Sequence, residues 1–232
     1  MEHLVSKPII IEFNGLPGSG KTTIACQLRH ELESLSCKVS FNYYKRRFHR
    51  FALLVFLNPR YWSLIKEIFL YSRLFTKKRF LTNILYVASY VRKYNDFADN
   101  SKNGILIIDQ GFVQSLISLA HQDNLPQSDR LDNIIRKSGI DKMPLFIINC
   151  DVEEMVSDDR ITSRPKNGCR VEKMSETERL LTLKVQKENF IILRKKIETV
   201  CPNLAFANID TNVAVHDNVD IIIQCIKDAF HN

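Results

Sequence analysis

The stretch Gly15-Leu16-Pro17-Gly18-Ser19-Gly20-Lys21-Thr22 decides the fold of this chain. It matches the phosphate-binding pattern G-x-x-x-x-G-K-[ST]. An apolar run, Pro8–Phe13, precedes it, and a stretch with helical spacing, Thr22–Ser34, follows it. This is the strand, loop and helix context that the pattern requires. The stretch therefore predicts a loop that binds the phosphates of a nucleotide.

The chemistry of phosphate binding explains each residue type in this loop. Glycines let backbone N–H groups turn inward toward phosphate oxygens, and the N-terminus of the following helix adds partial positive charge. We expect Lys21 to reach the β- and γ-phosphates and the Thr22 hydroxyl to ligate Mg²⁺. The predicted nucleotide-binding residues are Gly15, Gly18, Ser19, Gly20, Lys21, Thr22 and Thr23.

Four further apolar runs have the character of buried strands, because they are short and bounded by polar or turn residues. They are Lys38–Asn42, Ile105–Asp109, Leu145–Asn149 and Leu204–Ile209. Stretches with helical spacing lie among them, at Phe112–Ala120, Glu176–Thr199 and Val219–Phe230. Strands that alternate with helices predict an α/β fold, a parallel sheet with helices on both faces. At 232 residues, we expect a single domain spanning 1–232.

Asp109 is the strongest candidate for a second metal ligand, because it ends the apolar run that begins at Ile105. A carboxylate at the tip of a buried strand beside a phosphate loop typically orders Mg²⁺. An aspartate at the start of a helix can also be a simple cap. We favour the metal role, so the predicted Mg²⁺ ligands are Thr22 and Asp109.

Residues 158–173 are predicted to form an arginine-rich lid. Arg160 and Arg164 are four residues apart, so we expect them to share one helix face. A proline and a glycine then break the helix, and Arg170 follows. Guanidinium groups on a hinged loop suit the neutralisation of charge on a transferring phosphoryl group. The alternative is a solvated basic turn paired with the neighbouring aspartates.

The positive charge of the chain is concentrated in one segment. Between Tyr43 and Asp96 there are 12 Lys and Arg residues and two acidic residues, whereas the whole chain carries +7. We read 43–100 as a basic insertion of two or three helices beside the ligand crevice, where it would attract an anionic acceptor. A solvated face and contact with an anionic membrane through Phe51–Leu57 are alternatives. We favour core packing for this apolar stretch, and no recognised module supports specific nucleic-acid binding.

The amino-acid composition excludes a mostly disordered, a collagen-like and a disulfide-scaffold protein. Hydrophobic residues make up 45% and charged residues 25% of the chain, which is ordinary for a folded domain. None of the six cysteines forms a C-x-x-C pair, so we expect free thiols in a reducing compartment. The longest uncharged run in the middle, Phe80–Val91, has 12 residues, fewer than the ~20 that cross a bilayer. We therefore expect a cytoplasmic protein without a transmembrane segment.

The order of these motifs resembles the nucleoside-monophosphate kinases, and the thymidylate kinase family most closely. The resemblance rests on the strand that enters the phosphate loop, the Asp109 strand, and the lid that ends in Arg170-Val171-Glu172. It implies a P-loop kinase fold with a five-stranded parallel sheet and a transferase that uses ATP and Mg²⁺. It also implies catalytic roles for Lys21, Asp109, Arg160, Arg164 and Arg170. Relatives often dimerise, so a homodimer is a further expectation.

The acceptor side departs from the thymidylate kinase pattern. Pro17 replaces an acidic residue that meets the nucleotide sugar, and Gln110 replaces an arginine that contacts the acceptor phosphate. Asn42-Tyr43-Tyr44-Lys45 lies where an Arg-Glu-Pro-Gly motif is usual, and Ser89 stands at a later arginine position. We therefore expect a small anionic acceptor other than dTMP, such as a nucleotide, a sugar or a phosphosugar. The alternatives are a regulatory ATPase without an acceptor and a thymidylate kinase with an unusual acceptor site.

Overall fold

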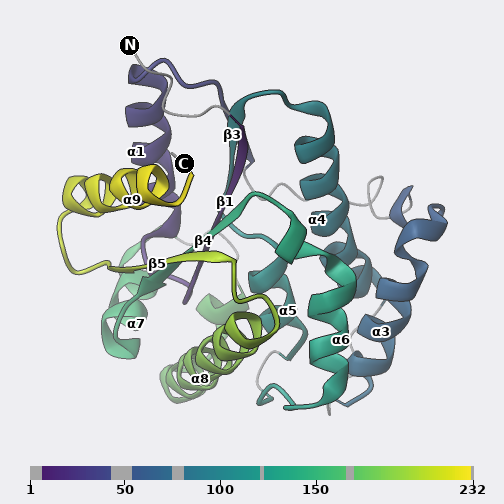
Figure 1. The fold of residues 1–232 in the computed structure, drawn as a ribbon. Helices are drawn as coiled ribbons and strands as arrows, with labels where there is room; N and C mark the ends of the chain where they lie inside the picture. The colour runs from purple at the N-terminus through teal and green to yellow at the C-terminus, as the bar shows by residue number, and fades with distance from the viewer. Residues whose placement is uncertain (1–6, 43–53, 75–80, 121–122, 166–169, 231–232) are drawn as a thin grey trace.

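A computed structural model describes residues 7–42, 54–74, 81–120, 123–165 and 170–230 (Figure 1). Within these ranges the centre of the protein is a parallel sheet of five strands in the order β2-β3-β1-β4-β5. The strands are β1 (Pro8–Gly15), β2 (Val39–Asn42), β3 (Gly104–Ile108), β4 (Leu145–Asp151) and β5 (Ala205–Asp210). The predicted α/β fold class is confirmed.

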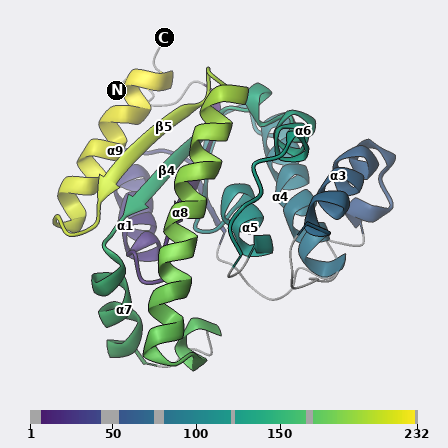
Figure 2. The same ribbon diagram turned by 90° about the horizontal axis from the view of Figure 1, so that it is seen from below.

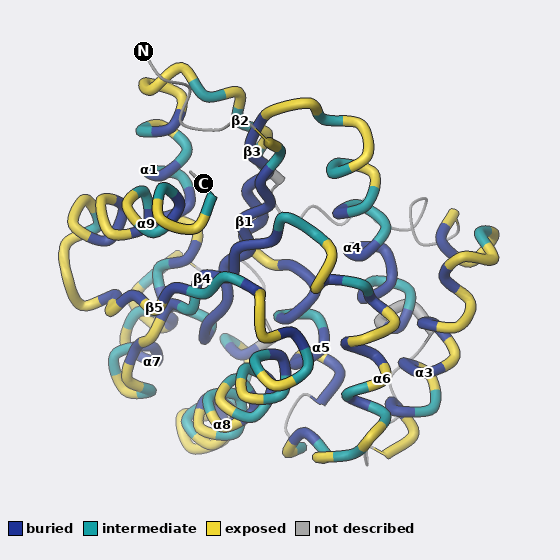
Figure 3. The backbone as a smooth tube through the Cα atoms, viewed as in Figure 1, coloured by how far each residue is buried: buried dark blue, intermediate teal, exposed yellow. Residues whose placement is uncertain are grey.

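The central strand β1 is buried on both of its faces. Ile9, Ile10 and Ile11 are each 0% exposed. Ile11 lies opposite Ile107 of β3 on one side and opposite Phe146 of β4 on the other. A strand covered by helices on both faces reads as a continuous apolar run, which is why Pro8–Phe13 was recognisable in the sequence. Figure 3 shows this burial along the middle of the sheet.

Helices cover the two faces of the sheet unequally (Figures 1 and 2). One face packs against α1 (Lys21–Ser34) and α9 (Val215–Phe230). The other face packs against α4 (Leu81–Asn100), α5 (Phe112–Ala120), α6 (Asp129–Ser138) and α8 (Glu176–Val200). The helix α3 (Trp62–Ser72) lies outside this layer, against α4 and α6. The result is the expected three-layer arrangement.

A third, smaller apolar cluster attaches the lid to the rest of the protein. It joins Leu16 of the phosphate loop, Ile161 of α7 (Glu154–Ser163), Val171 of the short 3-10 helix η3 (Arg170–Lys173) and Leu183 of α8. The phosphate loop, the lid helix and α8 therefore share one packed junction.

The basic insertion is only partly described, because residues 43–53 and 75–80 lie outside the described ranges. The part between them and beyond contains a 3-10 turn at Pro59–Tyr61 and the two long helices α3 and α4. In the apolar stretch predicted to pack on the core, Val55 is buried, whereas Leu54, Phe56 and Leu57 are about half exposed. None of the helices in the described ranges is long and apolar enough to cross a membrane.

Three helices differ from the sequence expectations. The helix α6 (Asp129–Ser138) was not predicted at all. The last helix, α9, begins at Val215, four residues before the predicted start. The lid helix also ends earlier than expected, and its consequence for Arg164 is described below.

Candidate active site

The loop between β1 and α1 requires glycine at two positions. Gly15 has φ of +147°, and a Cβ there would lie 2.5 Å from the carbonyl oxygen of Cys150 in β4. Gly18 has φ of +82°, and its Cβ would lie 2.7 Å from the carbonyl oxygen of Ser157 in α7. Positive φ and close backbone contact both exclude larger residues. The glycines thus allow the loop to pass closely between β4 and the lid helix.

Lys21 lies across the mouth of this loop and is nearly buried. Its Nζ donates hydrogen bonds to the carbonyl oxygens of Gly15, at 2.8 Å, and Leu16, at 2.7 Å. It also donates to Oγ of the fully buried Ser19, at 3.2 Å. The ammonium group is therefore held at the first turn of α1, next to the backbone that would surround a phosphate.

The structure brings Thr22 and Asp109 together at the carboxyl edge of the sheet. The Thr22 hydroxyl donates to Oδ2 of Asp109 at 2.9 Å, and Oδ1 of Asp109 is buried without a hydrogen-bond partner among the described residues. Burial raises the pKa of Asp109, while the Thr22 hydrogen bond and the charge of Lys21 oppose that rise. A buried carboxylate oxygen without a partner, beside a threonine hydroxyl, suits a hard cation such as Mg²⁺. The residues present fit the predicted metal.

The lid helix α7 is tied to the phosphate loop and to α8. The Ser157 hydroxyl donates to the carbonyl oxygen of Pro17. Asp158 accepts two hydrogen bonds from the Arg179 guanidinium of α8, from Nε and, at 3.0 Å, from Nη2. Both side chains of this ion pair are about 10% exposed. The pair fixes α7 against α8 at the start of the lid.

The predicted helix face shared by Arg160 and Arg164 is wrong. The helix α7 ends at Ser163, and Arg164 has extended backbone angles, φ −82° and ψ 154°. A residue before proline is driven out of the helical region by the proline ring, and Pro165 follows Arg164 directly. Arg164 therefore lies outside the helix that carries Arg160.

The lid arginines have different partners. Arg160 donates to the carbonyl oxygen of Thr211 at 3.0 Å and to its hydroxyl at 3.2 Å. Arg164 forms an ion pair with Glu172 at 3.1 Å. The third predicted lid residue, Arg170, begins the 3-10 helix η3. Arg160 thus connects the lid to the loop after β5, whereas Arg164 closes the lid upon itself.

A buried polar junction beside the loop was not predicted from the sequence. Glu12 of β1 is 0% exposed and accepts a hydrogen bond from the Tyr94 hydroxyl of α4 at 2.6 Å. It also accepts from the backbone N–H of Val113, at 2.7 Å, at the start of α5. Burial raises the pKa of Glu12 to about 7, although these hydrogen bonds oppose the rise. An acidic residue inside an apolar strand was the available signal.

The backbone of Gly111 packs directly against this junction. A Cβ at this position would overlap the Tyr94 hydroxyl and the Glu12 carboxylate. Gly111 follows Asp109 by two residues, so the buried junction is directly linked to the predicted metal ligand. The arrangement positions the ends of β1 and β3 relative to α4 and α5.

The predicted acceptor side is described in part. Gln110 is exposed directly after Asp109. Ser89 is buried, and its hydroxyl donates to the carbonyl oxygen of Tyr86 at 2.7 Å within α4. Arg92, three residues further, pairs with Asp96 at 3.4 Å. Residues 43–45, in the stretch where the family motif would fall, lie outside the described residues.

The glycine-containing loop after β1, the strand order and the helices on both faces of the sheet define a P-loop α/β fold. Among solved structures, the chain is similar to deoxyadenosine kinase from M. mycoides with the products dCMP and a flexible dCDP bound. That match has a TM-score of 0.55 and 17% identity, and it covers 95% of this chain and 100% of that chain. The same kinase with bound dATP gives a TM-score of 0.54 at 16% identity, over 93% of this chain and 97% of that one. With no matching protein-family model and no matching curated sequence, these likenesses establish the fold.

Proposed function

We propose that this protein is a kinase that transfers the γ-phosphoryl group of ATP to a small acceptor. The observation that carries the proposal is the cluster of Lys21, Thr22 and Asp109 at the carboxyl edge of the sheet, where open α/β sheets bind their ligands. Three residue types with the chemistry of phosphate and Mg²⁺ binding meet there. Lys21 and Thr22 begin α1 after β1, and Asp109 follows β3, the neighbour of β1 in the sheet.

The residues of the chain divide the work of binding. Backbone N–H groups of the loop and the start of α1 would hold phosphate oxygens, and Lys21 would supply a positive charge beside them. Thr22 and Asp109 would hold Mg²⁺, whose charge, when it is bound with ATP, assists the departure of the transferred group. Catalysis would then come from positioning and charge neutralisation.

Arg160 is the better candidate of the two described lid arginines for contact with phosphate. Its described hydrogen-bond partners, Thr211 and Asn212, are neutral, so they leave the guanidinium charge uncompensated. Arg164 already faces the carboxylate of Glu172, which is only 6% exposed. We propose that Arg160 stabilises the transferring charge and that Arg164 shapes the lid. Arg170 keeps its predicted catalytic role as part of this proposal.

For the acceptor, we propose a nucleoside or a nucleotide other than dTMP. The structurally similar deoxyadenosine kinase is described in three structures, with dCMP and dCDP, with dATP and with dCTP bound. Gln110 provides no positive charge for an acceptor phosphate, and a nucleoside acceptor would need none. Sugars and phosphosugars are the second choice, and the basic insertion would attract the phosphate group of a phosphosugar.

The test measures ADP release from ATP and Mg²⁺ with a panel of acceptors and a control without one. The panel holds deoxynucleosides, nucleoside monophosphates including dTMP, sugars and sugar phosphates. Stimulation by one acceptor, with identification of its phosphorylated product, is the expected outcome. Equal ADP release with and without every acceptor would contradict the proposal and favour an ATPase.

A further inference from the structure

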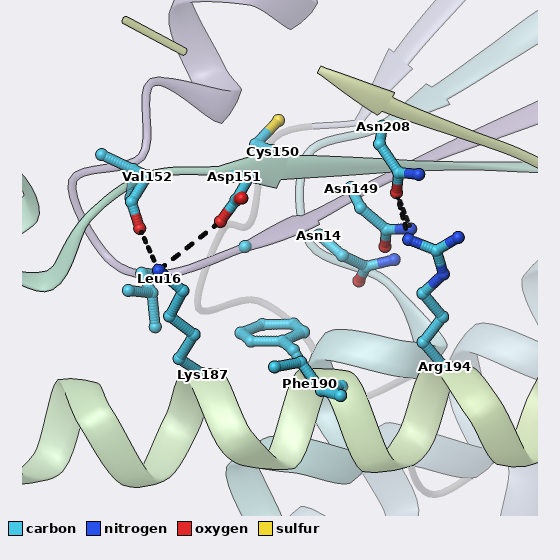
Figure 4. A pocket seen from close by; sticks show the side chains of 12 residues that line it. Asn14, Leu16, Asn149, Cys150, Asp151, Val152, Lys187, Phe190, Arg194 and Asn208 are labelled. Carbon is cyan, nitrogen blue, oxygen red and sulfur yellow. Dashed lines mark hydrogen bonds and ion pairs between the residues drawn. The ribbon is translucent and has the colours of Figure 1, made fainter. Parts of the chain in front are cut away.

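A hollow lies between the sheet and α8, away from the predicted metal ligands. Its volume is about 340 Å³, and it is lined by the ends of β1, β4 and β5 and by one face of α8 (Figure 4). Asp109 follows β3, which lies on the opposite side of β1 in the strand order. The hollow is therefore a separate feature of the sheet, although Gly15 and Leu16 of the phosphate loop form part of its wall.

Three asparagines form a row across the floor of this hollow. Asn14 of β1 lies opposite Asn149 of β4, and Asn149 lies opposite Asn208 of β5. Register partners in a sheet point to the same face, and all three asparagines line the hollow. Nearer the start of the same strands, this face carries apolar residues such as Ile10 and Ile147, which pack in the core. Along this face of the sheet, the side chains therefore change from apolar core residues near the strand starts to polar amides beneath α8.

The row leaves one amide without partners. Asn149 donates to Oδ1 of Asn208 at 3.1 Å, whereas both the oxygen and the nitrogen of the Asn14 amide are buried without a hydrogen-bond partner among the described residues. Asn14 itself is 0% exposed. Buried polar groups are costly unless something satisfies them. A donor and an acceptor side by side on one amide match the paired acceptor and donor on the edge of a nucleobase.

The helix α8 lines the hollow with the aromatic ring of Phe190 and with two cations, Lys187 and Arg194, that are already paired with carboxylates. Phe190 of α8 faces the sheet beside Asn14 (Figure 4), and an aromatic ring is a common stacking surface for bases. Lys187 is already bound to the carbonyl oxygen of Val152 at 3.2 Å and to Glu154 at 3.5 Å. Arg194 is likewise paired with Glu198 at 2.7 Å. Since carboxylates already balance both cations, the hollow favours an uncharged ligand.

We propose that this hollow is a second ligand site, and that it binds an uncharged nucleoside or free nucleobase through the Asn14 amide and the Phe190 ring. Its volume lies in the range of ~300 to 1,000 Å³ that is typical of small-molecule sites. The proposal goes beyond phosphoryl transfer and does not require that activity. Its occupant would contact the outer side of Gly15 and Leu16, whose carbonyl oxygens hold Lys21.

The test compares nucleoside binding to the wild type, to Asn14→Leu and to Asn133→Leu, by isothermal titration calorimetry. Leucine has nearly the shape of asparagine and no amide, and Asn133 is an exposed position on α6 outside the hollow. Adenosine, guanosine, cytidine, thymidine and uridine are titrated separately. For at least one of them we expect Asn14→Leu to weaken binding tenfold or more, with less than a twofold effect of Asn133→Leu.

Two outcomes would overturn the proposal. If no nucleoside shows an affinity that depends on Asn14, the amide is served by water alone. If inorganic phosphate displaces the bound nucleoside, the hollow is an anion site. Should Asn14→Leu fail to fold, Phe190→Leu and Asn208→Ala provide the same comparison. ADP release is followed in parallel, so that a failure of the kinase proposal is seen separately.

Discussion

Glu12 is the residue at which β1, α4 and α5 are held together. Its carboxylate binds the Tyr94 hydroxyl and the first backbone N–H groups of α5. A carboxylate at a helix N-terminus is favourable, but complete burial disfavours its charge. The second effect is larger, because the pKa of Glu12 is raised to about 7.

This raised pKa predicts a pH-dependent stability. Between the ordinary pKa of 4.5 and about 7, the folded protein keeps a proton on Glu12 that the unfolded chain has lost. The stability that the folded protein gains from protonated Glu12 is fully present below pH 4.5 and is lost as the pH rises through 7. We expect Glu12→Gln, which imitates the protonated form, to gain stability relative to the wild type from pH 5 to pH 8. Urea unfolding at several pH values measures this, and parallel curves would contradict it.

Gln110 supports a second prediction about a single residue. Gln110→Arg restores one family feature of thymidylate kinases, while Pro17 and the buried Ser89 remain. Ser89 donates its hydroxyl within its own helix and provides no charge. We therefore expect no phosphorylation of dTMP by Gln110→Arg in a coupled ADP assay. Turnover of dTMP by this variant alone would show that the other differences matter little.

At the scale of elements, the lid depends on one buried ion pair. Asp158 of α7 and Arg179 of α8 are both about 10% exposed and share two hydrogen bonds. Removing one partner of a buried pair leaves the other charge uncompensated and costs about 3–5 kcal/mol. We expect this loss in the free energy of unfolding of Asp158→Ala.

Asp159→Ala is the matched control for this prediction, because Asp159 is the next residue and is exposed. Substitutions at exposed sites usually change stability by less than about 0.5 kcal/mol. Chemical denaturation of both variants measures the difference. Equal stabilities would mean that the ion pair does not fasten the lid.

The elements could be predicted where the local pattern was strong. The β1 strand, the phosphate loop and α1 follow from an apolar run and a motif that occur together. The helix α6 was missed although Leu131, Ile134 and Ile135 have helical spacing and Gly139 ends the helix with φ of +67°. The end of α7 was misplaced by one residue, because Pro165 acts on the residue before it as well as on itself.

At the scale of the whole molecule, nucleotide binding should stabilise the fold. A ligand that binds the folded state alone, at 100 times its Kd, adds about 2.7 kcal/mol to the free energy of unfolding. We expect ATP with Mg²⁺ to raise the melting temperature of the wild type and EDTA to remove part of that rise. Thermal unfolding followed by fluorescence measures both effects.

We expect the substitution Lys21→Ala to remove phosphoryl transfer without unfolding the protein. Lys21 contributes the positive charge beside the predicted phosphate position, and it also ties the loop through its three hydrogen bonds. Removing one such stabilising group commonly costs about 100- to 1,000-fold in turnover. We expect phosphoryl transfer to fall at least this far while the far-ultraviolet circular dichroism spectrum stays unchanged. Retained transfer would exclude the assigned role.

Site residues could be predicted from the sequence when they belong to one local pattern, and not when their partners lie far away along the chain. Lys21, Thr22 and Asp109 were found because each belongs to a local pattern, a motif or a strand end. Tyr94 lies 82 positions after Glu12 in the chain, so no local pattern joins them. The row of three asparagines depends in the same way on the register of three strands.

The central place of β1 also governs the order in which this protein can assemble during synthesis. Both neighbours of β1 come much later in the chain, since Pro8 pairs beside Gly104 and Ile10 beside Leu145. Such distant pairings require the closure of large loops, whose entropic cost comes before the stabilising contacts form. They therefore slow folding. Until Asp151 has left the ribosome, one edge of the isoleucine-rich strand has no partner and is open to wrong association. The packing around β1 can therefore be completed only after β4 has been made and has docked.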